Sequence, residues 1–210
     1  MGFIERHICV AELLSTLLVS TLLVSTSASV LKMNIFILSL IHCEIAMFMM
    51  DKHVSKILLE AVQMLCSAKR ILDPEDPINE KIYKLAHKNH PVTIWCRKSK
   101  ANFQWTLDLI EALHNEWRFR YGHPSTKYHK SYMMAMLLKE HMPSDDAFEE
   151  KGLTPFALAM PVEFKSDDPV ESYRKYYMSD EKQKIASWKK GREKPYWYGD
   201  TPLTPGGKPL

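Results

Sequence analysis

The pattern of apolar residues predicts a helix from Asp51 to about Leu72, and the rest of the chain can be arranged around it. Apolar side chains recur at the three- and four-residue spacing of a helix that packs one face against a core. They are Val54, Ile57, Leu58, Ala61, Met64, Leu65, Ala68, Ile71 and Leu72. Asp51 is predicted to be the N-cap, because a short acidic side chain can accept hydrogen bonds from the free N–H groups of the first turn.

The opposite face of this helix is polar. It carries His53, Lys56, Glu60 and Gln63. Since an α-helix rises about 1.5 Å per residue, His53 and Glu60 lie two turns, or roughly 10 Å, apart. The two side chains cannot contact each other, but one extended substrate can contact both. The ordinary interpretation is a solvated face with an i,i+4 ion pair between Lys56 and Glu60.

Helical spacing continues through most of the chain. It predicts helices at residues 43–50, 79–87, 100–121, 127–141, 170–178 and 181–190. Ser99 is expected to cap the helix at 100–121 and Gly122 to end it. Residues 33–40 are predicted to be a buried strand, and residues 92–95 either a short strand or the start of the next helix. The predicted fold is therefore mainly α: a compact single-domain helical fold with one short N-terminal strand.

A second stripe on the helix at 100–121 mixes polar and aromatic residues. It consists of Asn102, Trp105, Leu109, Glu116 and Arg120. One interpretation is that the stripe lines a cleft. The other is that Glu116 and Arg120 form a simple surface pair and that Trp105 belongs to the core. The second interpretation is the simpler one.

The first 32 residues differ from the rest. Residues 17–26 repeat the sequence Leu-Leu-Val-Ser-Thr twice, after a head that carries Arg6. This is the shape of a secretory signal, or else of a low-complexity extension upstream of a start at Met33. The second interpretation is preferred. The domain prediction is a dispensable or signal-like segment at residues 1–32, a helical functional domain at 33–198, and a disordered tail at 199–210.

Charge is segregated along the chain although the formal net charge is only +3. Residues 143–171 hold eight acidic side chains against two lysines, whereas residues 182–194 hold six basic side chains against one glutamate. The four cysteines show no metal-binding spacing, so neither a metal nor another cofactor is predicted, and reduced thiols indicate a cytoplasmic protein. Secretion is the alternative if residues 1–29 are a signal peptide.

Basic residues occur beside aromatic ones, which favours nucleic-acid binding. Cations neutralise phosphates, and rings stack on bases. The candidate DNA-binding residues are Lys52, Lys56, Arg97, Lys98, Lys100, Arg120, Lys130, Lys190, Arg192 and Trp197. The predicted partner is double-stranded DNA, bound by a monomer without stable membrane association.

Several short motifs resemble those of the pyrimidine-dimer DNA glycosylases of the phage endonuclease V type. An aspartate, a histidine two residues later and a glutamate seven residues after that share one helix, as Asp51, His53 and Glu60. Glu44-Ile45-Ala46, residues 90–95 and the closing residues 194–198 are similar in kind and in order. The likeness covers most of residues 33–198 in outline. Other stretches, among them Thr154-Pro155-Phe156, look like a group of short phage proteins of unassigned function.

The resemblance implies base excision with strand cleavage. An N-terminal α-amine, here that of Asn34, attacks the sugar C1′ of the damaged nucleotide and displaces the base, and the resulting imine undergoes β-elimination. Glu60 stabilises the imine and moves protons, and His53 helps to hold the flanking phosphates. If the chain is encoded by a phage, the expected compartment is the host cytoplasm.

This sequence departs from the family's pattern at the nucleophile and around the glutamate. Asn34 stands where the family has a small residue, typically threonine, and Leu59 and Gln63 replace arginines. Lys52 or Lys56 is an alternative amine. Two other classes of function stay open: a non-enzymatic nucleic-acid-binding phage accessory protein, and a structural or interaction protein.

Overall fold

The computed structural model describes residues 34–199. The chain divides into two units between Met33 and Asn34, and only the second unit is considered below. The predictions for residues 1–32 lie outside the described residues. The same holds for the predicted tail from residue 200 onward.

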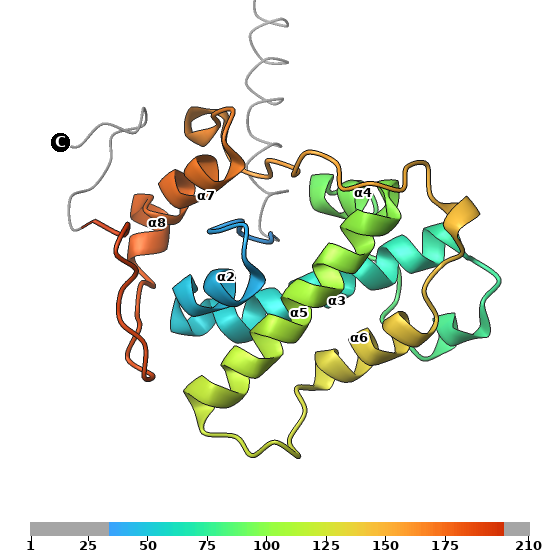
Figure 1. The fold of residues 1–210 in the computed structure, drawn as a ribbon, viewed down its shortest axis with the longest axis horizontal. Coiled ribbons are helices and arrows are strands. Elements are labelled where there is room, and N and C mark those ends of the chain that lie inside the picture. Colours follow the sequence, from blue (N-terminus) through green and yellow to red (C-terminus); the bar gives the residue numbers. More distant parts are fainter. Residues whose placement is uncertain (1–33, 200–210) are drawn as a thin grey trace, which may run out of the picture. The chain divides into compact units, whose positions relative to one another are not determined.

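Two long helices form the centre of the fold, and the prediction of a mainly helical fold is confirmed. Helix α3 (Asp51–Leu72) packs across α5 (Lys100–Tyr121), and α2 (His42–Phe48), α4 (Pro91–Lys98) and α6 (Lys130–Glu140) pack around this pair (Figure 1). Most of the apolar stripe of α3 lies in the core, where Val54, Leu58 and Leu65 are fully buried, but Ile71 near the end of the helix is 38% exposed. Each fully buried side chain contributes roughly 1.5–3 kcal/mol by leaving water.

Both ends of α5 follow from local sequence as predicted. The Ser99 hydroxyl accepts hydrogen bonds from the N–H groups of Ala101 and Asn102. Gly122 ends the helix with a φ of 62°, a left-handed conformation that costs glycine little because it has no Cβ. Asp51, in contrast, is not an N-cap: Met50 holds that position, and Asp51 is the first helical residue. Its carboxylate binds partners elsewhere in the chain.

The segment around residue 80 is less helical than predicted. A 3-10 helix, η1 (Pro77–Glu80), is followed by irregular backbone. The Arg70 guanidinium donates hydrogen bonds to the carbonyl groups of Asn79, Ile82 and Tyr83, which a continuing helix would use for itself. Residues 92–95 are helical, as one of the two interpretations expected. They lie in α4, where Pro91 occupies the first turn.

Residues 34–40 form an irregular segment, buried up to Ser39, in which the structure has no β-strand, although a strand was predicted at 33–40. Their partners are distant in sequence: the Arg174 side chain, for example, donates to the Leu38 carbonyl. Residues 143–168 form the predicted connection and include the 3-10 helices η2 (Asp145–Ala147) and η3 (Val162–Phe164). The isolated bridge between Ser99 and Glu150 ties this connection to the start of α5.

The C-terminal part of the described chain begins with α7 (Pro169–Tyr177), close to the prediction, and α8 (Asp180–Gln183). The predicted helix at 181–190 is wrong beyond Gln183. Residues 184–199 instead lie over the start of α3, where the N–H of Asp51 donates to the Ser187 carbonyl and the Trp188 indole donates to the Phe48 carbonyl. We call residues 184–199 the C-terminal strap.

Candidate functional site

The backbone nitrogen of Asn34 lies against the Glu60 carboxylate. Its N–H donates to Glu60 Oε2 at 3.0 Å, across 26 residues of sequence. Both residues are buried, with exposed fractions of 3% and 6%. The Asn34 side chain is fixed as well, because its Nδ2 donates to the Ala159 carbonyl at 2.6 Å and its Oδ1 lies 3.1 Å from the Tyr173 hydroxyl. Two residues predicted to be catalytic are therefore in direct contact.

Burial raises the pKa of the Glu60 carboxyl, while the Asn34 N–H and the Lys56 ammonium act in the opposite direction. Lys56 Nζ lies 3.4 Å from Glu60 Oε1, and its side chain is 54% exposed. The i,i+4 pair expected from the spacing is therefore present, but the glutamate half of it is not solvated. A carboxyl whose pKa is raised toward neutrality is suited to proton transfer.

His53 does not lie on a solvated face as the spacing suggested. It is 2% exposed and stacks on Phe36, with ring centroids 5.2 Å apart. Its Nδ1 lies 2.8 Å from the Tyr177 hydroxyl, which itself accepts a hydrogen bond from the Met50 N–H. The hydroxyl proton is thus free to point at Nδ1, which places the imidazole proton on Nε2.

Burial, together with the charges of Lys182 and Lys56, lowers the pKa of His53 to about 3. The imidazole is therefore neutral at physiological pH. A neutral ring cannot supply the positive charge with which His53 was predicted to hold phosphates. Its contacts instead connect α3 with residues 34–40 and with α7.

Lys182 belongs to the same cluster and was not predicted. It lies on α8, and its Nζ is 5.7 Å from the centroid of the Phe36 ring and 5.1 Å from that of Tyr176. Its side chain is only 13% exposed. Its charge acts on both Glu60 and His53. The one sequence signal for it was membership of the basic run at 182–194. We call Asn34, Glu60, His53, Lys56 and Lys182 the Glu60 cluster.

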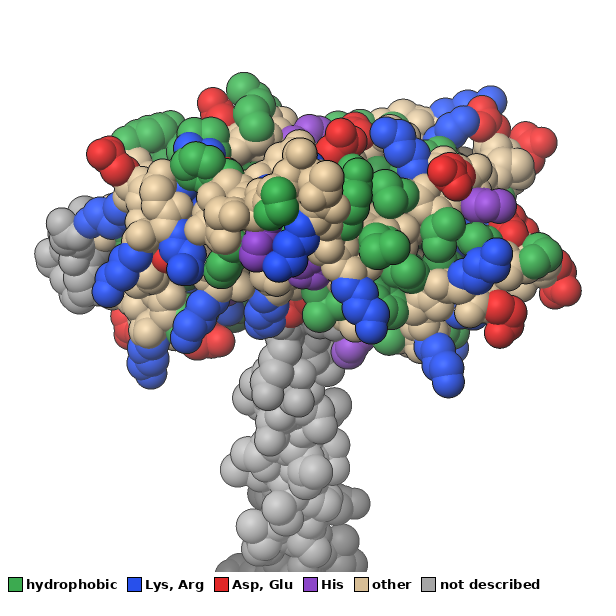
Figure 2. Space-filling model, turned by 90° about the horizontal axis from the view of Figure 1, so that it is seen from below, with side chains coloured by type: hydrophobic (Ala, Val, Ile, Leu, Met, Phe, Trp, Pro, Cys, Tyr) green, Lys and Arg blue, Asp and Glu red, His purple; other side chains and the backbone are tan. Residues whose placement is uncertain are grey.

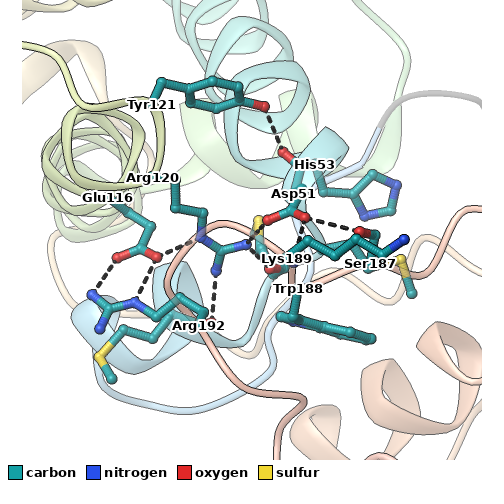
Figure 3. Close-up of polar contacts among 12 residues, drawn as sticks. Asp51, His53, Glu116, Arg120, Tyr121, Ser187, Trp188, Lys189 and Arg192 are labelled. Atoms are coloured by element: carbon teal, nitrogen blue, oxygen red, sulfur yellow. Dashed lines mark hydrogen bonds and ion pairs between the residues drawn. The ribbon is translucent and has the colours of Figure 1, made fainter.

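A second polar cluster joins the end of α2, the start of α3, the last turns of α5 and the C-terminal strap (Figure 3). The Arg120 side chain is fully buried and pairs with Glu116 at 2.6 Å and with Asp51 at 3.1 Å. It also donates to the carbonyl groups of Ala46, Met47 and Met49, at the end of α2. Glu116 and Arg120 are therefore not the surface pair of the simpler interpretation, and Arg120 is not placed to contact DNA as predicted.

Arg192 and Asp51 complete this second cluster. Arg192 binds Glu116 through two hydrogen bonds of 2.9 and 2.8 Å. The Asp51 carboxylate accepts from the Ser187 hydroxyl and from the Lys189 N–H. Two acidic and two basic side chains thus balance in charge, and they attach the C-terminal strap to α3 and α5. Arg192, another predicted DNA ligand, is committed to this ion pair.

The other predicted DNA-binding residues separate into two groups. Arg97, Lys98 and Lys100 lie at the start of α5, where Arg97 donates to the Lys88 carbonyl, Lys98 pairs with Glu150 at 2.9 Å, and Lys100 pairs with Asp145. Because α5 has 22 residues, its other end is about 30 Å away. None of these contacts joins the three cations to a residue of the Glu60 cluster.

The second group lies at the far end of α5 and near the start of α3. Lys190 stands over the Tyr121 ring with Nζ 5.1 Å from the centroid, and the Tyr121 hydroxyl donates to the Asp51 carbonyl. Lys52, Lys130 and Lys190 are all exposed. Lysine and arginine side chains are spread over the face seen in Figure 2. Trp197 is partly buried, with the Arg174 guanidinium 4.9 Å from its ring centroid.

Searches of protein-family models, curated proteins and solved structures find no match to this chain. Among residues 34–199, no three His, Cys, Asp or Glu side chains are grouped so that they could hold a metal ion. None of the helices in that range is long and apolar enough to cross a membrane. Two open hollows of about 570 Å³ lie away from the Glu60 cluster, one beside residues 153–158 and one beside the end of α3.

Proposed function

We propose that this chain is a DNA glycosylase with AP-lyase activity that acts on damaged bases of the pyrimidine-dimer type. The observation that carries the proposal is the 3.0 Å contact between the Asn34 nitrogen and the buried Glu60 carboxylate. An amine at that nitrogen and a carboxyl of raised pKa are the two groups that such a reaction needs, and here they touch.

The reaction requires Asn34 to be the first residue, because the peptide bond to Met33 removes the nucleophilicity of its nitrogen. An α-amine has a pKa near 8, so a useful fraction is unprotonated at neutral pH. It attacks C1′ of the damaged nucleotide, the base leaves, and the adduct becomes an imine. Glu60 then accepts the C2′ proton, and the 3′ phosphate departs by β-elimination.

The surroundings of Glu60 suit a polyanionic substrate. Lys56 is exposed beside the carboxylate, and Lys182 lies over the Phe36 ring. Lys52 precedes Lys56 by one turn of α3. Cations at these places supply sequence-independent attraction to phosphates. Lys56 is also the amine that can replace the α-amine in a chain that keeps Met33, since its Nζ is 3.4 Å from Glu60 Oε1.

A second candidate is a non-enzymatic DNA-binding protein. The observation that favours it is that the Asn34 nitrogen is an amide wherever Met33 precedes it. Such a protein keeps the basic residues near α3 but forms no covalent intermediate. The two candidates therefore differ in one measurable property.

Borohydride trapping on DNA with an abasic site separates them. Borohydride reduces an imine to a stable adduct, so the protein remains attached to DNA only if an amine has reacted. We expect an adduct from protein released by a protease with Asn34 as its first residue, and none from the same protein after acetylation of the α-amine. An adduct that persists after acetylation and maps to Lys56 assigns the lysine as nucleophile. No adduct from any form contradicts the enzymatic proposal.

A further inference from the structure

Outside the Glu60 cluster, aromatic rings from α5, from α6 and from the loop between them form a stack. The His114 and Tyr132 rings are nearly parallel, with centroids 3.9 Å apart. Tyr128 continues the arrangement, at 5.7 Å from His114 and with an interplanar angle of 12°. The Arg118 guanidinium lies 4.8 Å from the centroid of the Tyr128 ring. Tyr128 and Tyr132 are also nearly parallel, with centroids 6.2 Å apart, so the three rings form one compact stack with Arg118 over Tyr128.

His114 and Tyr128, two members of the stack, differ in exposure. His114 is 1% exposed, and neither of its ring nitrogens has a hydrogen-bond partner among the described residues. Burial lowers its pKa to about 4, so at neutral pH it is an uncharged aromatic surface. Tyr128 is 48% exposed. The stack is therefore anchored in the protein through His114 and reaches solvent at Tyr128.

Cations surround Tyr128, where the stack reaches solvent. Residues 117–132 contain four basic side chains and no acidic one. Arg120 is buried in its own network, which leaves Arg118, Lys127 and Lys130 for this surface. Lys127 and Lys130 are exposed, and Lys127 Nζ lies 6.0 Å from the centroid of the Trp117 ring. Positive charge beside a half-exposed ring, over which the Arg118 guanidinium already lies, fits a ligand that is both flat and anionic.

The loop is also tied to the helix that carries Glu60. The Ser55 hydroxyl on α3 lies 3.0 Å from His129 Nε2. Ser55 precedes Glu60 by five residues, which is about 7.5 Å along the helix axis. Five residues also turn the helix by about 140°, so the loop and Glu60 lie close along α3 but on different sides of it.

We propose that Tyr128 and Arg118 form a stacking platform for an unpaired nucleobase, with Lys127 and Lys130 on the phosphates beside it. Bases outside a double helix stack on aromatic rings and on arginine guanidinium planes, and this stacking tolerates any base sequence. The inference rests on the proposed function only for its ligand, DNA. It does not depend on Glu60 chemistry.

The test is binding of the full chain to a fluorescein-labelled oligothymidylate, followed by anisotropy. Since stacking on one aromatic side chain is worth roughly 1–3 kcal/mol per base, Tyr128→Ala should weaken binding about tenfold. Tyr128→Phe keeps the ring and should bind within about twofold of the parent. Tyr128→Leu keeps an apolar side chain without a ring, so a folded Tyr128→Leu protein with weakened binding excludes a folding artefact. Equal binding by all three variants overturns the platform.

A second probe locates the contact on the base. In a duplex with 2-aminopurine opposite a stable abasic analogue, stacking should quench the fluorescence of the 2-aminopurine with the parent and with Tyr128→Phe. Quenching that persists with Tyr128→Ala overturns the proposal. Borohydride trapping by Tyr128→Ala is measured in parallel: an adduct with unchanged quenching leaves the enzymatic proposal standing without the platform. Lost quenching without any adduct from the parent leaves the platform standing without the enzyme.

Discussion

Replacing Arg120 by methionine tests whether the buried ionic cluster is structural. The Arg120 side chain is fully buried, and it is the group that contacts Asp51, Glu116 and the end of α2 together. Methionine fills part of the same volume without charge. It leaves three carbonyl groups at the end of α2 and one oxygen of each carboxylate without this donor, although Asp51 keeps Ser187 and Lys189, and Glu116 keeps Arg192.

The expected loss follows from these contacts. Breaking a buried ion pair by removing one partner costs about 3–5 kcal/mol, and each buried group left without a partner costs about 1–3 kcal/mol. Because both carboxylates and the Ala46 carbonyl keep other donors, the total loss expected for Arg120→Met is at least about 3–5 kcal/mol. For a domain of this size, that corresponds to a decrease in Tm of roughly 6–20 °C.

Urea denaturation followed by circular dichroism measures this loss. Arg118→Met is a matched control, because Arg118 lies on the same helix two residues earlier and makes an exposed hydrogen bond to the Lys127 carbonyl. We expect the control to change the free energy of unfolding by less than about 1 kcal/mol. If Arg120→Met is as stable as the control, the cluster does not hold α2, α3 and the C-terminal strap together.

Two further predictions concern charge. Because burial holds the pKa of His53 at about 3, below its ordinary 6.5, the unfolded chain binds a proton that the folded chain does not. The free energy of unfolding should therefore fall by up to about 1.4 kcal/mol per pH unit as the pH decreases from 6.5 toward 3. His53→Gln should flatten this dependence. If urea titrations at several pH values give the same slope for the parent and for His53→Gln, the prediction is wrong. If exposed lysines near α3 bind phosphates, Lys52→Ala with Lys190→Ala should lower the slope of log affinity against log salt by about 2. Arg97→Ala with Lys100→Ala, at the paired end of α5, should leave that slope unchanged; the reverse result would place the DNA at the other end of the helix.

Local sequence predicts the central helices well for a physical reason. In α3 the apolar residues repeat at helical spacing over 22 residues, and in α5 the cap at Ser99 and the stop at Gly122 act within one turn. Such signals need no knowledge of the rest of the fold. The predicted helix at 181–190 has only Ile185, Ala186 and Trp188 as apolar residues, and the observed helix ends at Gln183.

Contacts between distant residues could not be obtained in this way. Asp51 was expected to cap its own helix, but its carboxylate binds Lys189 and Ser187, more than 130 residues later. Burial of His53 depends on Phe36 and Tyr177, and no periodicity in α3 reports it. The proximity of Asn34 to Glu60 was an expectation from the family resemblance, not from the pattern of either segment.

The most direct test of the enzymatic proposal is the rate at which Glu60→Gln cleaves DNA with an abasic site, measured with protein that begins at Asn34. Glutamine can still accept the Asn34 N–H, and since burial raises the pKa of the Glu60 carboxyl, loss of the charge should not weaken folding. Glu80→Gln, at an exposed position, is the matched control. We predict that Glu60→Gln binds this DNA within about twofold of the parent but cleaves it at least about a hundredfold more slowly. Cleavage by Glu60→Gln at the parent rate would contradict the assignment of this carboxyl to the reaction.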